Sequence, residues 1–403
     1  MKKLKILVVP ANEGGCAYYR AIMPFEKLQE ICHDRVEVRM DKNPLGVDEA
    51  SGTWKPDWKF ENLKWCDVVV VSNISNFGGQ YTARIIGKAK LFGKFVHFDT
   101  DDLLTDLYDD HRLKQVYEDK ELDKITMHMY QSSDLVTVTQ SKFAERIKPY
   151  VGRALAVVKN AIDYKLPCWN VPRKPNSKVV RIGWAGGIHH DPDVREFSVV
   201  THLVNQKVGS ENVWWDFYGH PPNVPDDDWQ VDVWKGYKKH LVGAMKGRKN
   251  WTIHNALPPH AYGGMFANMD IAIAPLQMNN FNDSKSDIKV AECGRFAVPL
   301  VASNVGCYDE TIKNWETGYL VPPKASRMTW VKVLSRMVKE HALRNRMGQD
   351  LKKITDAAFD INNLVHHRLD LYEECFKALK CDPRDFRNCL LYTSDAADEE
   401  DSV

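Results

Sequence analysis

Short apolar runs alternate with amphipathic stretches through the first part of the chain. The four valines within Asp67–Ser72 suit a strand that is buried on both faces. Further strands are predicted at Leu4–Val9, Val36–Met40, Phe95–Phe98, Leu135–Thr139 and Ala156–Lys159, and helices at Ala17–Ile31, Tyr81–Leu91 and Lys142–Val151. Such alternation predicts a parallel sheet wrapped by helices.

A proline-bearing segment, Asp163–Ser177, interrupts this pattern and is typical of a linker. The alternation then restarts, with strands predicted at Lys178–Trp184, Val213–Tyr218, Trp251–His254, Ile271–Ala274, Leu300–Ser303 and Tyr319–Val321, and helices at Val194–Val204, Ser286–Arg295, Met328–Glu340 and about Asn362–Lys380. We therefore predict an α/β protein with two Rossmann-like, doubly wound domains, residues 1–163 and 178–358, followed by a C-terminal helix within residues 359–388. Ligands of such folds bind in the cleft at the carboxyl ends of the strands.

Length and composition agree with two ordinary domains. The chain has 403 residues, of which 44% are hydrophobic and 27% charged. The apolar run after the basic start ends at Val9, which is too short for a signal peptide, and no stretch approaches the roughly 18 apolar residues of a membrane span. We expect a cytoplasmic protein. Its nine cysteines form no CxxC pair, which favours free thiols over a zinc site or disulfides.

The C-terminal end differs from the rest. Residues 389–399 resemble a translated sequencing-library adapter, so we expect residues 389–403 to be non-native or disordered and the gene to come from an environmental assembly; a natural acidic tail is the alternative. The tail holds five acidic residues and no Lys or Arg. Without it, 55 basic residues stand against 49 acidic ones, and the formal charge is +6 in place of +1. A mildly basic body is compatible with an anionic partner.

Glycine pairs follow a predicted strand in each half. Gly14 and Gly15 precede the first helix, and Gly186 and Gly187 precede His189 and His190. Paired glycines let the backbone approach a ligand, and a helix that follows them offers free N–H groups to an anion. We predict a phosphate-binding role for both loops, with His190 as a donor. An ordinary strand-to-helix turn is the alternative.

Three carboxylates, Asp99, Asp101 and Asp102, follow the strand predicted at Phe95–Phe98. At that end of a strand they would face the cleft, where one could orient or deprotonate an acceptor hydroxyl. They could also hold a divalent metal, or cap the next helix. We predict the catalytic role and no metal.

The most specific pattern lies at residues 282–303. Ser284, Lys285 and Ser286 stand where a loop turns into a helix and could hold a diphosphate. Lys289 and Glu292 continue one face of that helix. We expect Glu292 to accept both hydroxyls of a ribose. A surface Lys–Glu pair is the alternative.

This segment resembles the donor-binding signature of the retaining GT-B glycosyltransferase family. Glu292 matches the ribose-binding Glu, and Ala297–Ser303 matches the strand after it, while Ser284 takes the place of a Glu. Weaker matches are Asn160–Asp163 at the domain junction and Ile271–Leu276 before the donor loop. The resemblance implies the GT-B fold, a last helix that crosses back to the first domain, and retaining transfer from a nucleotide sugar, expected to be a UDP-sugar such as UDP-glucose, without metal or another cofactor. Because Ser284 stands where the family has a Glu, the resemblance does not indicate which sugar is transferred.

The stretch from Gly14 to Arg20 and the loop from Trp184 to His190 are similar to a bacteriophage branch of this family, some members of which modify hydroxymethylated DNA bases. We therefore expect the acceptor to be 5-hydroxymethylcytosine in double-stranded DNA, in the cytoplasm of an infected host. Basic residues among Trp234, Tyr237 and Trp251 suit phosphate contacts and base stacking. The predicted acceptor or DNA contacts are Arg20, Lys235, Lys238, Lys239, Arg248 and Lys249.

Three other interpretations remain open. The acceptor could be a cell-surface glycan or a small molecule. The chain could be a non-catalytic nucleic-acid-binding protein, although a basic run is usually a solvated loop. It could also be a sugar-phosphate isomerase of the same two-domain shape.

Overall fold

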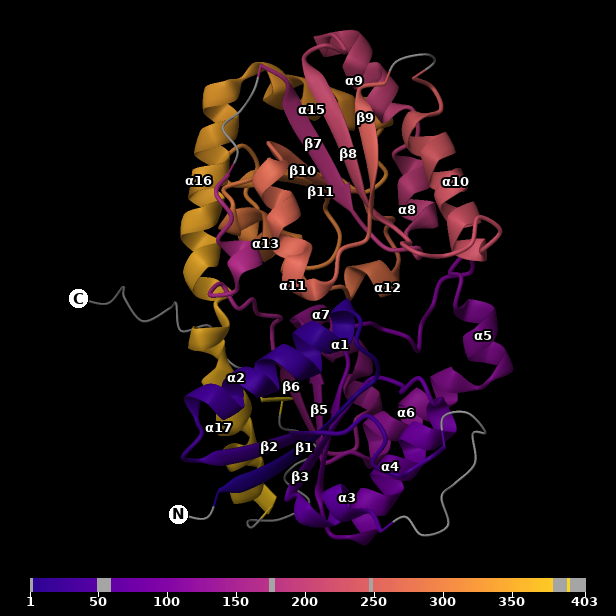
Figure 1. Cartoon of the computed structure of the whole chain (residues 1–403), viewed down its shortest axis with the longest axis vertical. Helices are drawn as coiled ribbons and strands as arrows, with labels where there is room; N and C mark the ends of the chain where they lie inside the picture. The colour runs from indigo at the N-terminus through magenta and orange to yellow at the C-terminus, as the bar shows by residue number, and fades with distance from the viewer. Residues whose placement is uncertain (1–2, 49–58, 174–177, 246–248, 380–389, 392–403) are drawn as a thin grey trace, which may run out of the picture.

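The structure is a computed structural model that describes residues 3–48, 59–173, 178–245, 249–379 and 390–391. Its apolar runs form two separate parallel sheets, each built mainly from one half of the chain (Figure 1). The first sheet has the strand order β13-β6-β5-β4-β3-β1-β2. Its strands are β1 (Leu4–Pro10), β2 (Val36–Met40), β3 (Val68–Ser72), β4 (Phe95–Asp99), β5 (Leu135–Val138), β6 (Ala154–Val157) and β13 (Leu390–Leu391).

Helices cover both faces of this sheet. The four valines of β3 are at most 1% exposed, as the uninterrupted apolar run predicts for a strand between two helical layers. The helical segments are α1 (Gly15–Ala17), the π-helical turn η1 (Tyr18–Ile22), α2 (Met23–Ile31), α3 (Glu61–Trp65), α4 (Gly79–Leu91), α5 (Lys114–Asp119), α6 (Leu122–Ser132), α7 (Ser141–Ile147) and η2 (Lys148–Tyr150).

One strand of the first sheet lies in the tail that was expected to be non-native or disordered. Leu390 and Leu391 pair in parallel with Leu155 and Ala156 of β6. Without β13, β6 would be an edge strand, and unpaired N–H and C=O groups at an edge accept a short apolar segment. These two residues form a strand, and the expectation of a non-native or disordered tail stays a prediction. The rest of 389–403 lies outside the described residues.

The second sheet has the order β12-β11-β10-β7-β8-β9. Its strands are β7 (Val180–Ala185), β8 (Val213–His220), β9 (Trp251–Asn255), β10 (Ile271–Ala274), β11 (Leu300–Ser303) and β12 (Gly318–Val321). The helical segments of this half are η3 (Pro167–Trp169), α8 (Asp191–Glu196), α9 (Val200–Val208), α10 (Trp229–Val242), α11 (Pro259–Tyr262), η4 (Gly263–Asn268), α12 (Asn280–Asp283), α13 (Ile288–Arg295), α14 (Tyr308–Thr311), α15 (Arg327–Lys339) and α16 (His341–Ala358).

The last helix returns to the first sheet. Helix α17 (Ile361–Leu379), yellow in Figure 1, runs beside α2 and packs on the first sheet. Its apolar residues Ile361, Val365, Leu369 and Tyr372 recur every three to four positions and are buried against strands β1 and β3. The amphipathic pattern near the C-terminus thus ties the two halves together.

Two of the differences from the predicted elements lie on either side of β7. The segment expected to be a linker contains Cys168 and Trp169, both buried in a core cluster of the second half, so it is partly a packed surface rather than a free connection. The helix expected at Val194–Val204 is interrupted at Val199, which has a φ of 63° and separates α8 from α9. In the described part of the chain, no helix is both long and apolar enough for a membrane crossing.

Candidate functional site

A cavity of about 470 Å³ lies where the carboxyl ends of the two sheets face each other. Most of its wall comes from the second half of the chain. The predicted site residues that line it are Gly15, Asp101, Asp102, Gly186, Gly187, His190, Lys285, Ser286, Lys289 and Glu292. The strand–loop–helix arrangement therefore brings together residues from every loop that the sequence singled out.

The glycine loop after β7 forms one wall of this cavity. A Cβ on Gly186 would lie 2.3 Å from the Trp184 ring, and one on Gly219, whose φ is +128°, would lie 2.0 Å from the Gly186 carbonyl oxygen. Side chains are thus excluded at both positions, which keeps the backbone close to the cavity. The Tyr237 hydroxyl of α10 donates to the Gly187 carbonyl and accepts from the His190 N–H, so it fixes the loop from behind.

His190 lines the cavity next to this loop. Its Nδ1 lies 2.8 Å from Oδ2 of Asp193, a carboxylate that is almost fully buried. That contact occupies Nδ1 and leaves Nε2 as the ring nitrogen that can serve a ligand. The neighbouring His189 is not among the residues that line the cavity and stacks on His111, with 5.7 Å between the ring centroids.

Helix α13 carries an ion pair into the cavity. Lys289 Nζ lies 3.0 Å from Glu292 Oε2 and 2.7 Å from the Tyr262 hydroxyl. Burial raises the pKa of Glu292, and the ammonium of Lys289 opposes that rise. Burial would lower the pKa of Lys289, but Glu292 and Tyr262 outweigh it and raise that pKa, so the ammonium stays charged. The pair is partly open: the Lys289 side chain is 22% exposed and that of Glu292 is 3% exposed.

Lys285 connects the two halves of the chain across the cavity. Its ammonium lies 3.2 Å from Oδ1 of Asp102 and 4.3 Å from the centre of the Phe281 ring. Burial would lower the pKa of Lys285, but Asp102 more than compensates and raises it. Asp102 is 25% exposed and is the single carboxylate paired with Lys285 among the described residues, so the ammonium can exchange this partner for a phosphate.

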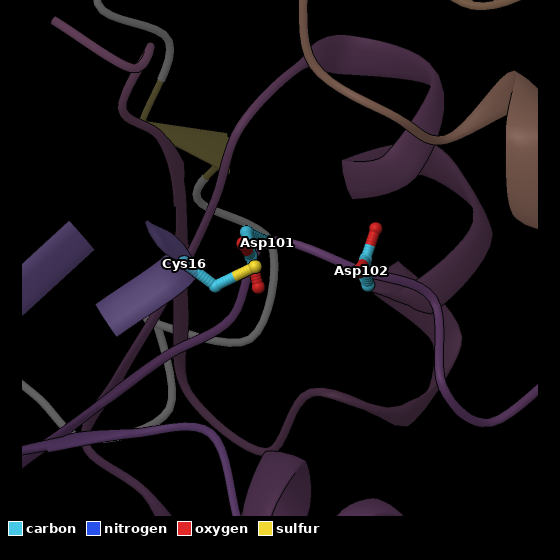
Figure 2. Close-up of side chains that lie close together, drawn as sticks. All are labelled: Cys16, Asp101 and Asp102. Carbon is cyan, nitrogen blue, oxygen red and sulfur yellow. The ribbon is translucent and has the colours of Figure 1, made fainter. Parts of the chain in front are cut away.

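Asp101 and Asp102 also approach Cys16, and one potential ligand atom from each of the three residues lies within 4.8 Å of the others. Figure 2 shows the Cys16 sulfur next to the Asp101 carboxylate, with Asp102 on the other side. Asp101 already accepts from Asn73 at 2.8 Å, and burial, followed by the charge of Asp102, raises its pKa. The donors around both carboxylates are therefore protein groups. The absence of a metal requirement stays a prediction.

Arg20 and Asp99 do not line the cavity, so the predictions of an acceptor contact for Arg20 and of a carboxylate that orients or deprotonates an acceptor for Asp99 are wrong. The Arg20 side chain is fully buried and Asp99 is 2% exposed. Arg20 Nε donates to Asp99 Oδ2 at 2.9 Å, and Thr137 donates to the same carboxylate. Burial would raise the pKa of Asp99, but the Arg20 guanidinium holds it below its usual value. Arg20 is a buried residue of the π-helical turn η1, and its charge is paired with Asp99 inside the first half of the chain.

Ser284 and Gly14 also lie outside the residues that line the cavity, contrary to prediction. The Ser284 hydroxyl is fully buried, donates to the Asn280 carbonyl and accepts from Arg146 at 3.2 Å. Ser284 is thus the C-terminal cap of the short helix α12 and not a ligand contact. Gly14 is exposed, and its N–H donates to the side chain of Asn12.

The basic run in the second half is part of helix α10 rather than a DNA-binding loop with stacking rings. Trp234 and Tyr237 are at most 2% exposed and belong to the core, whereas Lys235, Lys238 and Lys239 lie on the exposed face. Helical spacing separates the two kinds of residue. Base stacking by these two rings is therefore excluded. Lys249 is exposed, and Arg248 lies outside the described residues.

Several residues of the cavity wall were not predicted as site residues. They include Cys16, Tyr19, Asn160, Tyr218 and Tyr262. Cys16 and Tyr19 stand in the stretch between Gly14 and Arg20 that the sequence had already singled out, so the helix that begins at Gly15 could have indicated them. Tyr262 follows two prolines and has no periodic pattern around it, so nothing in the sequence indicated it.

Comparisons with known proteins fit this geometry. Residues 234–354 match the family described as glycosyl transferases group 1. No curated protein matches the chain. Sucrose-phosphate synthase from Thermosynechococcus elongatus has a similar structure, with a TM-score of 0.65 and 15% identity over 94% of this chain and 100% of that chain. A glycosyltransferase from Rickettsia africae gives a TM-score of 0.61 and 15% identity, again over 94% of this chain and 100% of that chain.

The molecule has the GT-B fold.

A third GT-B structure, HepE of Anabaena in complex with UDP and glucose, has a TM-score of 0.58 and 12% identity over 92% of this chain and 100% of that chain. The group 1 match covers α10 to α16, which includes Lys285, Lys289 and Glu292. The family match supports glycosyl transfer, and the solved structures show the fold.

Proposed function

We propose that the chain is a glycosyltransferase that binds a nucleotide sugar in the cavity between its two sheets and transfers the sugar to a hydroxyl group. The observation that carries this proposal is the placement of Lys285, Lys289 and Glu292 on one wall, opposite Asp101 and Asp102. A cavity of about 470 Å³ is within the range that small-molecule sites occupy. The group 1 match and the GT-B fold support the same reaction class.

The wall groups have complementary tasks in this reaction. Lys285 and Lys289 face the diphosphate, whose negative charge grows as the sugar leaves. Fixed cations and N–H groups at that position stabilise the transition state more than the ground state. Glu292 accepts hydrogen bonds from the ribose hydroxyls. The backbone of Gly186 and Gly187 lies close enough to pack against the donor because neither residue has a side chain.

Two further properties are part of the proposal. We expect retention at the anomeric carbon, because the segment around Glu292 resembles the retaining family. We expect no metal requirement, because Lys285 and Lys289 supply the positive charge that a cation supplies in other sugar transferases. Loss of activity with a chelator, followed by recovery with magnesium or manganese, would overturn the second expectation.

The donor is proposed to be a UDP-sugar. HepE of Anabaena was solved with UDP and glucose, and a pneumococcal O-GlcNAc transferase with UDP and GlcNAc. The direct test is to incubate the protein with UDP-glucose and candidate acceptors and to measure free UDP. Release that depends on an acceptor supports a transferase. Nucleic-acid binding without release of UDP from any nucleotide sugar supports a non-catalytic binder instead.

The acceptor is proposed to be 5-hydroxymethylcytosine in double-stranded DNA, on the side of residues 1–163, in the cytoplasm of a phage-infected cell. Support comes from the phage-like glycine loops, the net charge of +6 without the tail and the exposed lysines of α10. Extrusion of the base costs a few kcal/mol, which phosphate contacts would offset. The acceptor is tested by incubating the protein with a nucleotide sugar and with modified or unmodified duplexes, followed by mass analysis of the nucleosides. A hexose on the hydroxymethylated base supports DNA as the acceptor. Transfer only to glycans or to small hydroxyl compounds would show that the acceptor is one of these instead.

A further inference from the structure

Arg20 lies beneath the cavity, and the pattern of its hydrogen bonds constrains a residue that does face the ligand space. Its Nη1 donates to the Val158 carbonyl at 2.5 Å and to Asn160 Oδ1 at 3.1 Å. A guanidinium group has donors and no acceptor. The Asn160 atom nearest Arg20 must therefore be the amide oxygen, so the orientation of the Asn160 amide is fixed by chemistry.

The other end of the same amide reaches the second half of the chain. Asn160 Nδ2 donates to the Ser286 hydroxyl oxygen at 2.9 Å. Asn160 follows β6 and is 5% exposed, while Ser286 stands just before α13, and both line the cavity. Because the Ser286 oxygen accepts this bond, its own hydrogen has to point elsewhere. Within the described residues, the Ser286 hydroxyl has no acceptor for that hydrogen.

We propose that Arg20 and Asn160 act as positioning residues that orient the Ser286 hydroxyl so that it donates to a phosphate oxygen of the nucleotide sugar. The inference rests on the proposed function, since it assumes that a diphosphate occupies the cavity. It gives Arg20 a role in donor binding through Asn160 and without contact to the ligand.

The arrangement also links donor binding to the approach of the two halves. The bond from Asn160 to Ser286 crosses between a segment that follows the first sheet and a loop of the second. If the halves separate, Ser286 loses the donor that directs its hydrogen. Donor affinity and the closed arrangement are therefore coupled through one hydrogen bond.

The test compares UDP with uridine, because only UDP carries the diphosphate. Ser286→Ala should weaken UDP binding about tenfold and leave uridine binding unchanged, since it removes a hydrogen bond to a charged acceptor. Asn160→Asp has almost the same shape. Its carboxylate still accepts from Arg20 but now also accepts the Ser286 hydrogen and draws it away from the ligand. We expect a similar loss of about tenfold for UDP alone.

The double variant separates orientation from simple charge repulsion. If Asn160 acts through Ser286, adding Asn160→Asp to Ser286→Ala should cause little further loss. Asn345→Asp is the matched control, because Asn345 is exposed on α16 outside the cavity lining, and it should bind both ligands as the parent does. Thermal unfolding of each variant shows that it is folded. If Asn160→Asp does not fold, the comparison of UDP and uridine affinity in Ser286→Ala decides whether the Ser286 hydroxyl contacts the diphosphate.

Two results overturn the proposal while the proposed function stands. One is a Ser286→Ala variant that binds UDP as tightly as the parent. The other is a further tenfold loss when Asn160→Asp is added to Ser286→Ala, which shows repulsion by the new carboxylate. A parent protein that binds neither UDP nor uridine removes the proposed function itself and this inference with it.

Discussion

Two ion pairs lie near the facing edges of the two sheets, and they differ in what they leave available. Arg20 and Asp99 are 0% and 2% exposed, and Arg20 donates to Asp99, Val158 and Asn160. Lys289 and Glu292 are 22% and 3% exposed, and both line the cavity. For Glu292, the described residues supply a donor to Oε2 and none to Oε1. The hydrogen-bonding groups of the first pair are occupied by other protein groups, whereas Glu292 in the second pair can still accept a hydrogen bond from a ligand.

This difference shows that position at a strand's carboxyl end does not decide function. Asp99 ends β4 and was predicted to face the cleft. It is instead paired with the guanidinium of Arg20, which belongs to the π-helical turn η1. Asp101 and Asp102, just beyond the strand, do line the cavity. The availability of a carboxylate therefore depends on whether an internal cation occupies it.

The largest expected effect is loss of stability when the buried pair is broken. Asp99→Ala leaves the Arg20 charge buried without its partner, so the free energy of unfolding should fall by about 3–5 kcal/mol. Urea denaturation measures this. Glu292→Ala is the comparison, because Lys289 keeps Tyr262 and some solvent, and its loss should be clearly smaller. Equal losses in the two variants would contradict the distinction.

The second effect concerns ligand affinity. Glu292→Gln keeps the size of the side chain and removes its charge, so UDP should bind about ten- to a hundredfold more weakly, which corresponds to about 1.5–3 kcal/mol. Calorimetric titration is the measurement. Glu316→Ala changes an exposed glutamate that does not line the cavity and should bind UDP normally. Normal affinity of Glu292→Gln would remove Glu292 from the site.

The third effect is a pH dependence of stability from the Arg20–Asp99 region. His97 lies between Thr137 and Tyr372, and burial lowers its pKa to about 3. The unfolded chain, with the ordinary pKa near 6.5, binds this proton more readily than the folded one. The stabilisation is therefore complete above about pH 6.5 and is lost as the pH falls towards 3, with a slope of at most about 1.4 kcal/mol per pH unit. His97→Gln should flatten this slope, and an unchanged slope would show that His97 is protonated in the fold.

The smallest effect is expected on the exposed face of α10. Replacing Lys235, Lys238 and Lys239 by Ala should change stability by no more than about 0.5 kcal/mol for each residue and leave UDP affinity unchanged. If these lysines contact phosphates of a DNA acceptor, the salt dependence of DNA binding should weaken by about 0.9 in log–log slope for each contact. Binding to duplex DNA with an unaltered salt slope would exclude them from the DNA contact surface.

Much of the fold followed from periodicity. The run at Ile271–Ala274 is a strand with those bounds, because a strand buried on both faces needs an uninterrupted apolar segment. Val36–Met40 also has the predicted bounds, but it is an edge strand in which apolar and polar residues alternate. Helix α10 was not predicted, because its lysines and aromatic residues are closely mixed along the sequence and its average hydrophobicity is near neutral. Its buried face is marked by Val233, Tyr237 and Leu241, which recur every four residues, together with Trp234.

The cavity was predictable to the extent that it follows sequence motifs. Lys285, Ser286, Lys289 and Glu292 share one loop and helix, so their local spacing brings them to one wall. The burial of Arg20 was not predictable, since it depends on Asp99 and Asn160, which are distant in sequence. Likewise, Ser284 is turned inward by contacts to Asn280 and Arg146 that only the folded chain creates.

Amide hydrogen exchange with and without saturating UDP tests whether the cavity binds a nucleotide sugar. We expect protection in residues 183–190 and 284–292, where the second sheet meets the cavity, and none in the exposed part of α10. The buried network around Arg20 should already be slow to exchange without ligand. Protection confined to the first half or to α10, or no change with any nucleoside diphosphate, would contradict nucleotide-sugar binding at this site.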